Sequence, residues 1–204
     1  MKKNLYSCCF KRLLDAVAAL VLLTLLAPLL LLTIVLIKLD SRGPVFFRQK
    51  RMGRNGAVFN LLKFRTMTHR PRAVTGEVFL DNPEITRVGR WLRRYKVDEL
   101  PQLINVLTGD MSLVGPRPAL PEQRADYTEL ACKRLWVRPG LTGLAQVNGN
   151  IFLTWPERWA YDAQYVENLS LALDLKILLR TFAVVLKGEE RFVHKKPAGD
   201  AHGS

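Results

Sequence analysis

One long apolar run dominates the hydropathy pattern of the chain. Residues 16–37 contain no charged side chain, and a helix of this length, rising 1.5 Å per residue, crosses the hydrocarbon region of a bilayer. Pro28 lies near the middle of the run. Because a proline removes one backbone hydrogen bond and bends a helix, the pattern predicts a kinked membrane-associated helix.

The charges that flank this run favour a helix that enters and leaves on the same side of the membrane. Lys11 and Arg12 precede the run, and Lys38, Arg42 and Arg48 follow it. A spanning helix is expected to be more basic on its cytoplasmic side, whereas both flanks are basic here. We therefore favour a re-entrant helix with both ends in the cytoplasm over a single span or a helix buried in a soluble core.

Beyond this helix the pattern predicts a small mixed domain of the α/β (α+β) class. Apolar runs on either side of Asn55-Gly56 predict a β-hairpin, and residues 85–95 carry arginines at helical spacing. The stretch VDELPQLINVLTG predicts a helix that begins near Asp98 and is capped by Gly109. A short strand, MSLV, follows it.

The C-terminal part of the chain predicts two further helices and a polar tail. Residues 171–186 are too apolar for an ordinary surface helix, yet they include Asp174, Lys176 and Arg180. We expect this segment to be an interfacial amphipathic helix, or to pack on a neighbour, rather than to cross the membrane. The expected organisation is a membrane anchor over 1–40, a domain over 41–188 and a tail over 189–204.

Composition and charge narrow the class of partner. The chain has 204 residues, 49% of them hydrophobic, which is enough to bury a core. Its formal charge of +13 implies an acidic partner, such as anionic lipid, a phosphorylated substrate or nucleic acid. The three cysteines show neither zinc-site spacing nor a disulfide framework, which indicates a reducing compartment.

Two adjacent carboxylates, Asp98 and Glu99, are the candidate chemical groups. At a helix N-terminus they would feel the positive end of the helix dipole, and nearby arginines would act in the same direction, so we expect Asp98 to be ionised at neutral pH. One carboxylate could attack a phosphorus centre while the other binds Mg²⁺ together with substrate phosphate. Arg93 and Arg117 could neutralise diphosphate oxygens. The alternative is a helix cap beside a solvated acid.

Several motifs, taken together and in order, resemble one family. KRLLD, the proline-centred apolar helix, LLKFRTM, KVDELPQLINVLTGDMSLVGPRP, RPGLTGLAQVNG and YVENLSLALDLKILL are similar to the bacterial sugar transferases called monotopic phosphoglycosyl transferases. The resemblance covers most of the chain. It implies a re-entrant helix, a cytosol-facing catalytic domain over 41–188 with interfacial helices, and attachment to the bacterial inner membrane.

The resemblance also implies a reaction and a role for each candidate residue. The reaction transfers a phosphosugar from a UDP-sugar to polyprenyl (undecaprenyl) phosphate and releases UMP, as the first membrane step of glycoconjugate or exopolysaccharide synthesis. Asp98 would be the nucleophile that carries the phosphosugar covalently, and Glu99 would hold Mg²⁺. The implied phosphate-binding and active-site cations are Arg93, Arg117, Lys63 and Arg65, with Lys11 and Arg12 placed for the polyprenyl phosphate. For the last four, binding of anionic lipid would need only their charge.

The sequence departs from the family pattern at two places. Ala27 precedes Pro28 where the family has a serine whose hydroxyl helps to satisfy the broken helix, so Thr24 or another neighbour would have to substitute. Asn150 stands where an arginine implicated in nucleotide-sugar binding usually lies. Asparagine can form hydrogen bonds but cannot neutralise a diphosphate, so the identity of the sugar stays open.

Two rival functions fit the charge. A membrane-anchored nucleic-acid-binding protein should show aromatic platforms or a groove-reading helix among its basic residues, and we expect no nucleic-acid partner because neither is evident. A non-catalytic membrane-surface adaptor would tolerate Asp98→Asn. Within the enzyme hypothesis, Asp98 could instead be a general base for direct attack by the lipid phosphate. A homo-oligomer is compatible with the sequence.

Overall fold

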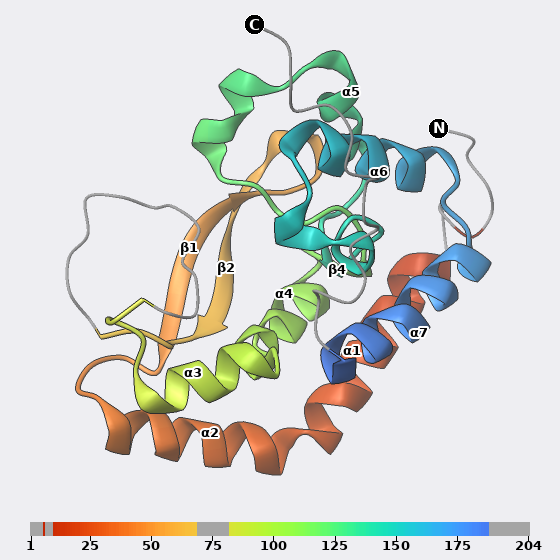
Figure 1. Ribbon diagram of the computed structural model, residues 1–204. Helices are drawn as coiled ribbons and strands as arrows, with labels where there is room; N and C mark the ends of the chain where they lie inside the picture. The colour runs from red at the N-terminus through yellow and green to blue at the C-terminus, as the bar shows by residue number, and fades with distance from the viewer. Residues whose placement is uncertain (1–5, 7–9, 69–81, 188–204) are drawn as a thin grey trace, which may run out of the picture.

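The computed structural model describes residue 6 and residues 10–68 and 82–187 of the chain (Figure 1). Two helices, α1 (Lys11–Leu25) and α2 (Ala27–Asp40), form an L along one edge, and the rest of the chain packs inside its angle. The predicted tail over 189–204 and the cysteines at 8 and 9 lie outside the described residues.

The helix pair is bent where the proline predicts. In the described part of the chain no single helix is long and apolar enough to cross a membrane, but α1 and α2 pass that test as a pair bent by 62°. Leu26 separates them, and Pro28 lies in the first turn of α2, where its missing N–H costs least. The Thr24 hydroxyl donates to the Leu20 carbonyl, so it does not satisfy the carbonyl that Pro28 frees.

The predicted hairpin is confirmed. Strands β1 (Phe46–Met52) and β2 (Val58–Phe64) pair antiparallel, with Met52 opposite Val58 beside the turn. The turn is a 3-10 element, η2 (Arg54–Gly56). Asn55 adopts a left-handed φ of 57°, a conformation that asparagine tolerates better than most residues. From near the C-terminal end of α2, the hairpin extends toward the upper part of the molecule in the view of Figure 1.

Helix α3 (Arg87–Arg94) lies against α2 and is fixed by a close backbone approach (Figure 1). The Thr86 side chain caps its N-terminus by accepting from the Gly89 N–H at 2.9 Å. A Cβ on Gly89 would fall 2.0 Å from the Thr66 carbonyl oxygen. Glycine is therefore required here, and it lets α3 lie directly against Thr66, two residues after the end of β2.

The helix predicted from Asp98 begins later than expected. Helix α4 runs over Gln102–Thr108 and ends at Gly109, as predicted, but Asp98 and Glu99 lie before it on the separate 3-10 turn η3 (Val97–Glu99). After α4, strand β3 (Ser112–Val114) pairs in parallel with β4 (Gly140–Thr142). The remaining elements are η4 (Pro121–Asp126), α5 (Glu129–Cys132), η5 (Lys133–Trp136), η6 (Gln146–Asn148), η7 (Asn150–Phe152), α6 (Trp155–Glu167) and α7 (Leu171–Lys187).

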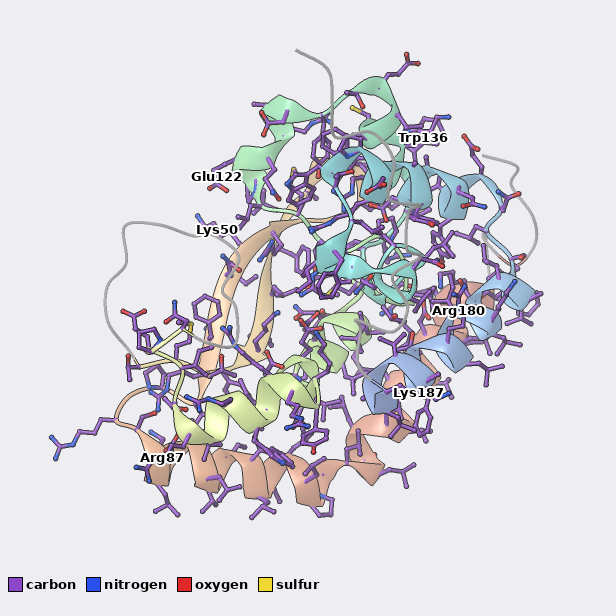
Figure 2. All side chains as sticks on the ribbon, in the orientation of Figure 1. Lys50, Arg87, Glu122, Trp136, Arg180 and Lys187 are labelled. Atoms are coloured by element: carbon purple, nitrogen blue, oxygen red, sulfur yellow. The ribbon has the colours of Figure 1, made fainter. Side chains whose placement is uncertain are left out.

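The helices of the apolar pair each contribute to a core and also expose apolar surface. Ala19 of α1 belongs to the main core with Tyr165 and Ile177, and Ile37 of α2 packs with Leu92 in a second core. The large exposed apolar residues of α1, α2 and α7 include Leu13, Leu25, Leu31, Leu39, Leu179, Phe182 and Leu186. Side chains along the outer edge of α2 point away from the domain (Figure 2), as expected for lipid contact.

Basic residues are spread over separate parts of the surface. Lys50 lies by the hairpin, Arg87 by the start of α3, and Arg180 and Lys187 on α7 (Figure 2).

Candidate active site

The two candidate carboxylates share one short turn between α3 and α4. Residue Lys96 precedes the turn with a left-handed φ of 57°, a conformation that costs a non-glycine residue free energy and is typical of functional sites. Asp98 and Glu99 follow and are 7% and 9% exposed. The structure therefore buries two adjacent acidic residues, which requires compensating partners.

The buried negative charge of Glu99 is compensated by two cationic side chains. Its Oε1 accepts from Lys63 Nζ at 2.7 Å and from Arg117 Nη2 at 2.8 Å. Burial alone would raise the pKa of Glu99, but the charges of Arg117 and Lys63 outweigh it and hold the pKa well below its usual range. Glu99 is therefore an ionised acceptor fixed by one cation from β2 and another from the loop after β3.

The surroundings of the Asp98 carboxylate differ from those of Glu99. No hydrogen bond or ion pair to its side chain occurs among the residues that the structure describes. Burial, followed by the charge of Glu99, raises the pKa of Asp98 to about 6, while Lys63, Arg93 and Lys96 act against that rise. Burial outweighs the nearby cations, so these cations do not lower the pKa below its ordinary value, but the expected ionisation of Asp98 at neutral pH agrees with a pKa of about 6. At pH 7 the ionised form of such a group still exceeds the protonated form by about tenfold.

Arg93 reaches the dyad from the last turn of α3. Its Nε donates to the Thr66 hydroxyl at 2.9 Å, and its charge lowers the pKa of Asp98. The contact depends on the close approach at Gly89, one turn earlier on the same helix. The structure thus brings together Asp98, Glu99, Lys63, Arg93 and Arg117, five of the nine residues predicted from sequence.

The Pro-Arg-Pro segment, residues 116–118, is held by its carbonyl groups. The carbonyl of Pro116 accepts from the Gly140 N–H at 2.9 Å, and that of Arg117 accepts from Arg134 Nη2 at 2.8 Å. The carbonyl of Pro118 accepts from Arg51 Nη1 at 3.2 Å. Because the two prolines have fixed φ and no N–H, these contacts set the direction in which the Arg117 side chain leaves the backbone.

The comparisons with known proteins identify the family. The family profile described as "Bacterial sugar transferase" matches residues 6–188. The chain belongs to the bacterial sugar transferase family. It is therefore a transferase, and the resemblance seen in its sequence motifs is confirmed.

Three relatives illustrate the range of names in the family. The chain is 46% identical over 179 residues to the "Uncharacterized sugar transferase EpsL" of Bacillus subtilis, with 88% of each chain covered. It is 41% identical to the "Exopolysaccharide production protein ExoY" of Rhizobium meliloti, over 86% of this chain and 84% of that one. It is 47% identical to the "UDP-glucose:undecaprenyl-phosphate glucose-1-phosphate transferase" of Caulobacter vibrioides, over 89% of this chain and 72% of that one.

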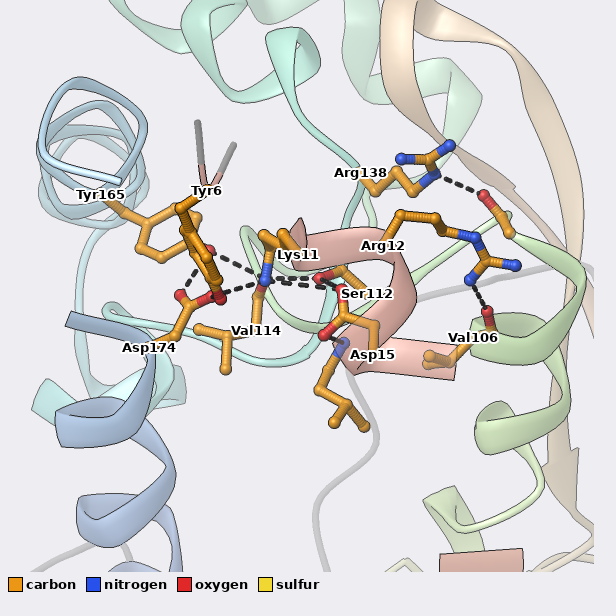
Figure 3. A network of polar contacts seen from close by, with 12 residues as sticks. Tyr6, Lys11, Arg12, Asp15, Val106, Ser112, Val114, Arg138, Tyr165 and Asp174 are labelled. Carbon is orange, nitrogen blue, oxygen red and sulfur yellow. Dashed lines mark hydrogen bonds and ion pairs between the residues drawn. The ribbon is translucent and has the colours of Figure 1, made fainter. Parts of the chain in front are cut away.

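In this sugar transferase, Lys11 and Arg12 have internal partners. Lys11 Nζ lies 2.6 Å from Asp174 Oδ2 and 3.5 Å from Asp15 Oδ2, and Asp174 also accepts from the Tyr165 hydroxyl (Figure 3). Arg12 donates to the carbonyls of residues 106 and 107 at the C-terminal end of α4. The dyad precedes the N-terminal end of α4, so the structure does not bring this basic pair to it.

Arg65 and Asn150 also lie apart from the dyad's direct contacts. The Arg65 guanidinium donates to the carbonyls of Ser41 and Arg42 and so ties the end of β2 to the residues after α2. Asn150 is 6% exposed, adopts a left-handed φ of 47°, and donates its N–H to the Ala145 carbonyl. Roles for these two residues in substrate binding stay predictions.

Sequence reasoning missed three residues that shape the site. The position of Lys96 was a signal, since it lies two residues before Asp98 and its charge lowers the pKa of both carboxylates. Arg51 and Arg134 hold carbonyls of the Pro-Arg-Pro segment. Nothing local distinguishes these two among 31 lysines and arginines, because their partners are distant in sequence.

Proposed function

We propose that this sugar transferase moves a sugar 1-phosphate from a UDP-sugar to polyprenyl phosphate through a covalent intermediate on Asp98. One observation carries the proposal: Asp98 is a buried carboxylate without a hydrogen-bond partner among the described residues, while its neighbour Glu99 is paired with two cations. A carboxylate that gives up no lone pair to a donor retains its nucleophilicity. The name of the Caulobacter relative supplies the two substrate classes.

The steps balance as two displacements at one phosphorus atom. An Asp98 carboxylate oxygen attacks the phosphorus that bears the sugar, the bond from that phosphorus to the bridging oxygen breaks, and UMP leaves with the electron pair. An oxygen of polyprenyl phosphate then attacks the same phosphorus. This attack breaks the bond to Asp98, regenerates the carboxylate and yields a polyprenyl diphosphate sugar.

The cations around the dyad would stabilise the charge that develops in each step. Arg117 and Arg93 would contact phosphate oxygens, since guanidinium groups match them in bidentate fashion. Lys63 would keep Glu99 ionised and in place. Because the phosphoryl group carries negative charge through both displacements, fixed positive charge in a largely buried site is the main aid that the chain can offer.

The donor set around Glu99 fits Mg²⁺. The described residues contain no group of three or more His, Cys, Asp and Glu side chains that could hold a metal, but Mg²⁺ is usually bound by one or two carboxylates together with substrate phosphates. Both hydrogen bonds to Glu99 use Oε1, which leaves Oε2 for the ion. When bound, Mg²⁺ would neutralise diphosphate oxygens and assist departure of UMP.

We also propose that α1 and α2 form a re-entrant anchor in the bacterial inner membrane, with the domain facing the cytoplasm. The 62° bend, the basic residues at both ends and the exposed leucines support this topology. Cysteines introduced at Phe10 and Arg42, in a chain whose own cysteines are replaced, should both react from the cytoplasmic side. Labelling of the two positions from opposite sides would show a spanning helix instead.

The test of the reaction is UMP release by the detergent-purified chain with Mg²⁺, undecaprenyl phosphate and a panel of UDP-sugars. We expect release with at least one sugar, and none from Asp98→Asn. Asp126→Asn, which changes an exposed carboxylate, is the matched control and should retain activity. If no UDP-sugar gives UMP with the folded wild-type chain, the proposed reaction is wrong.

A second arm separates the covalent mechanism from direct attack. Without polyprenyl phosphate, the wild-type chain should release about one equivalent of UMP and retain the labelled phosphosugar on Asp98, as expected for a ping-pong mechanism. If UMP appears only with the lipid present and no adduct forms, Asp98 would be a general base.

A further inference from the structure

A buried arginine outside the dyad supports the back of the Pro-Arg-Pro segment. Arg134 lies on η5 and is 6% exposed. Its Nη2 donates to the main-chain carbonyl of Arg117 at 2.8 Å and lies 3.0 Å from Oδ2 of Asp162 on α6. Its Nη1 donates to the Tyr127 hydroxyl at 3.0 Å. One guanidinium on η5 thus connects Arg117, the residue that contacts Glu99, with Tyr127 and with Asp162 on α6.

Stability alone does not explain this arrangement. A buried ion pair is weak evidence of stability, because well-packed apolar residues of similar volume often stabilise a protein equally. A guanidinium differs from an apolar side chain in offering five donors in one rigid plane. That plane holds the Tyr127 hydroxyl and the Arg117 carbonyl through hydrogen bonds, and the Asp162 carboxylate lies beside it as an ion pair.

The main-chain carbonyl of Arg117 is a group through which the orientation of this residue can be fixed. The Arg117 side chain is 40% exposed and contacts Glu99 at 2.8 Å. The flanking residues, Pro116 and Pro118, have no N–H that could donate a hydrogen bond and hold the backbone. A shift of the main chain at Arg117 would carry its side chain away from Glu99. The hydrogen bond from Arg134 to the Arg117 carbonyl opposes that shift directly.

We propose that Arg134, held by Asp162, is a positioning residue that sets the orientation of Arg117 through its main-chain carbonyl. The inference rests on the proposed function, in which the Arg117 side chain contacts the diphosphate. Arg134 itself does not touch the reacting atoms in this assignment. Its contribution is the geometry of Arg117, and a displacement of about 1 Å in a catalytic group can cost on the order of 10²-fold in rate.

A double-mutant cycle tests this assignment, with kcat/KM for UMP release measured for Arg134→Met, Arg117→Met and the double variant. If Arg134 acts through Arg117, each single change should lower kcat/KM strongly, and Arg134→Met should have almost no further effect once Arg117 is replaced. Multiplying effects in the double variant would overturn the proposal. Arg134→Lys, which keeps the charge but not the planar fork, should recover only part of the activity.

Hydrogen exchange gives a readout that does not need activity. In Arg134→Met and Asp162→Asn, the amides of residues 112–120 should exchange faster than in the wild-type chain. Arg138→Met is the matched control, since Arg138 also donates to a main-chain carbonyl, that of Gly109 at 2.8 Å, and it should leave this segment unchanged. If Arg134→Met fails to fold, Tyr127→Phe and Arg134→Lys take its place in both measurements.

The two readouts separate the failure of each proposal. A folded wild-type chain that releases no UMP overturns the proposed function, and the exchange of residues 112–120 still decides whether Arg134 holds the segment. Unchanged exchange in Arg134→Met and Asp162→Asn overturns the positioning role even in an active enzyme.

Discussion

Lys63 Nζ lies 2.7 Å from Oε1 of Glu99, and its positive charge also acts on the neighbouring carboxylate of Asp98. For Glu99 this charge, with that of Arg117, outweighs burial, so the pKa is held well below its usual range. For Asp98 the same charge only moderates burial, so the pKa is raised to about 6. The pKa values of two adjacent acids are thus shifted in opposite directions, a pattern that often marks a division of chemical roles.

The pH dependence of activity should follow Asp98. Because the carboxylate must be ionised to attack, kcat/KM for UMP release should rise with pH, reach about half its maximum near pH 6, where that pKa lies, and level off above it. Lys63→Met removes a charge that lowers this pKa, so the rising limb should move to higher pH. Lys50→Met, on the adjacent strand, is the control, and its limb should coincide with that of the wild type.

Asp98→Asn should raise the thermal unfolding midpoint at pH 7 while abolishing activity. A carboxyl group whose pKa is higher in the folded than in the unfolded state destabilises the fold once it ionises, and this cost grows as pH rises from about 4 to about 6. The amide avoids that cost. The gain should shrink as pH falls from about 6 and disappear below about pH 4, where Asp98 becomes protonated in both states. A surface cap would behave differently, because its replacement would leave the midpoint unchanged or lower it.

Glu99→Gln should have the opposite effect on stability. The pKa of Glu99 is depressed in the folded state, so its ionised form contributes stability that is present above the unfolded pKa and lost as pH falls through the folded one. At pH 7 the variant should unfold at a lower temperature than the wild type. The difference should narrow below about pH 4.5, as the carboxylate of the wild type becomes protonated. A constant difference from pH 3 to pH 7 would contradict the assigned charge state.

Gly89→Ala should damage α3 in spite of helix propensity. Alanine in an exposed helix interior is favoured over glycine by about 1 kcal/mol, but the new Cβ would lie 2.0 Å from the Thr66 carbonyl oxygen. The helix would have to move away from Thr66, and Arg93 would lose its contact with the Thr66 hydroxyl at 2.9 Å. Circular dichroism melts should show a lower midpoint, and UMP release should fall. A neutral or stabilising effect would show that α3 is free to shift.

Local signals in the sequence predicted most of the elements and only part of the site. Three features could be predicted from local sequence, because each depends on the conformational limits of one or two residues: the hairpin at Asn55, the bend near Pro28 and the end of α4 at Gly109. The predicted start of α4 was wrong, because a proline such as Pro101 is compatible with several positions in the first turn of a helix and so does not fix its first residue. The structure begins α4 at Gln102 and leaves the dyad on its own 3-10 turn.

The contacts of the site were less accessible, because they join distant residues. Lys63 and Glu99 are 36 positions apart and Lys11 and Asp174 are 163 apart, and no periodicity predicts such pairs. The resemblance to the sugar transferase family named Lys63 and Arg117, which contact Glu99 in the structure, while their roles in the reaction stay predictions. It could not show that burial raises the pKa of Asp98, since burial depends on how the whole domain packs.

The buried network between α1 and α7 should be essential for stability and separate from the chemistry. Asp174 Oδ2 accepts from Lys11 Nζ at 2.6 Å, and Oδ1 accepts from the Tyr165 hydroxyl at 2.8 Å (Figure 3). Asp174→Asn leaves a buried lysine without its main counter-charge. Breaking a buried pair in this way typically costs about 3–5 kcal/mol, because the remaining charge stays desolvated.

The consequence can be measured by thermal unfolding in detergent. Asp174→Asn should unfold at a clearly lower temperature, and the molecules that remain folded should keep a normal kcat/KM and pH profile, since among the described residues the hydrogen bonds and ion pairs of the Asp174 carboxylate go to Tyr6, Lys11 and Tyr165 and not to the dyad. Lys133→Met is the matched control. It breaks a 2.5 Å ion pair with Glu167 at the surface, where water and salt screen the charges, so its midpoint should barely change. A changed pH profile in Asp174→Asn with an unchanged midpoint would instead assign this network to catalysis.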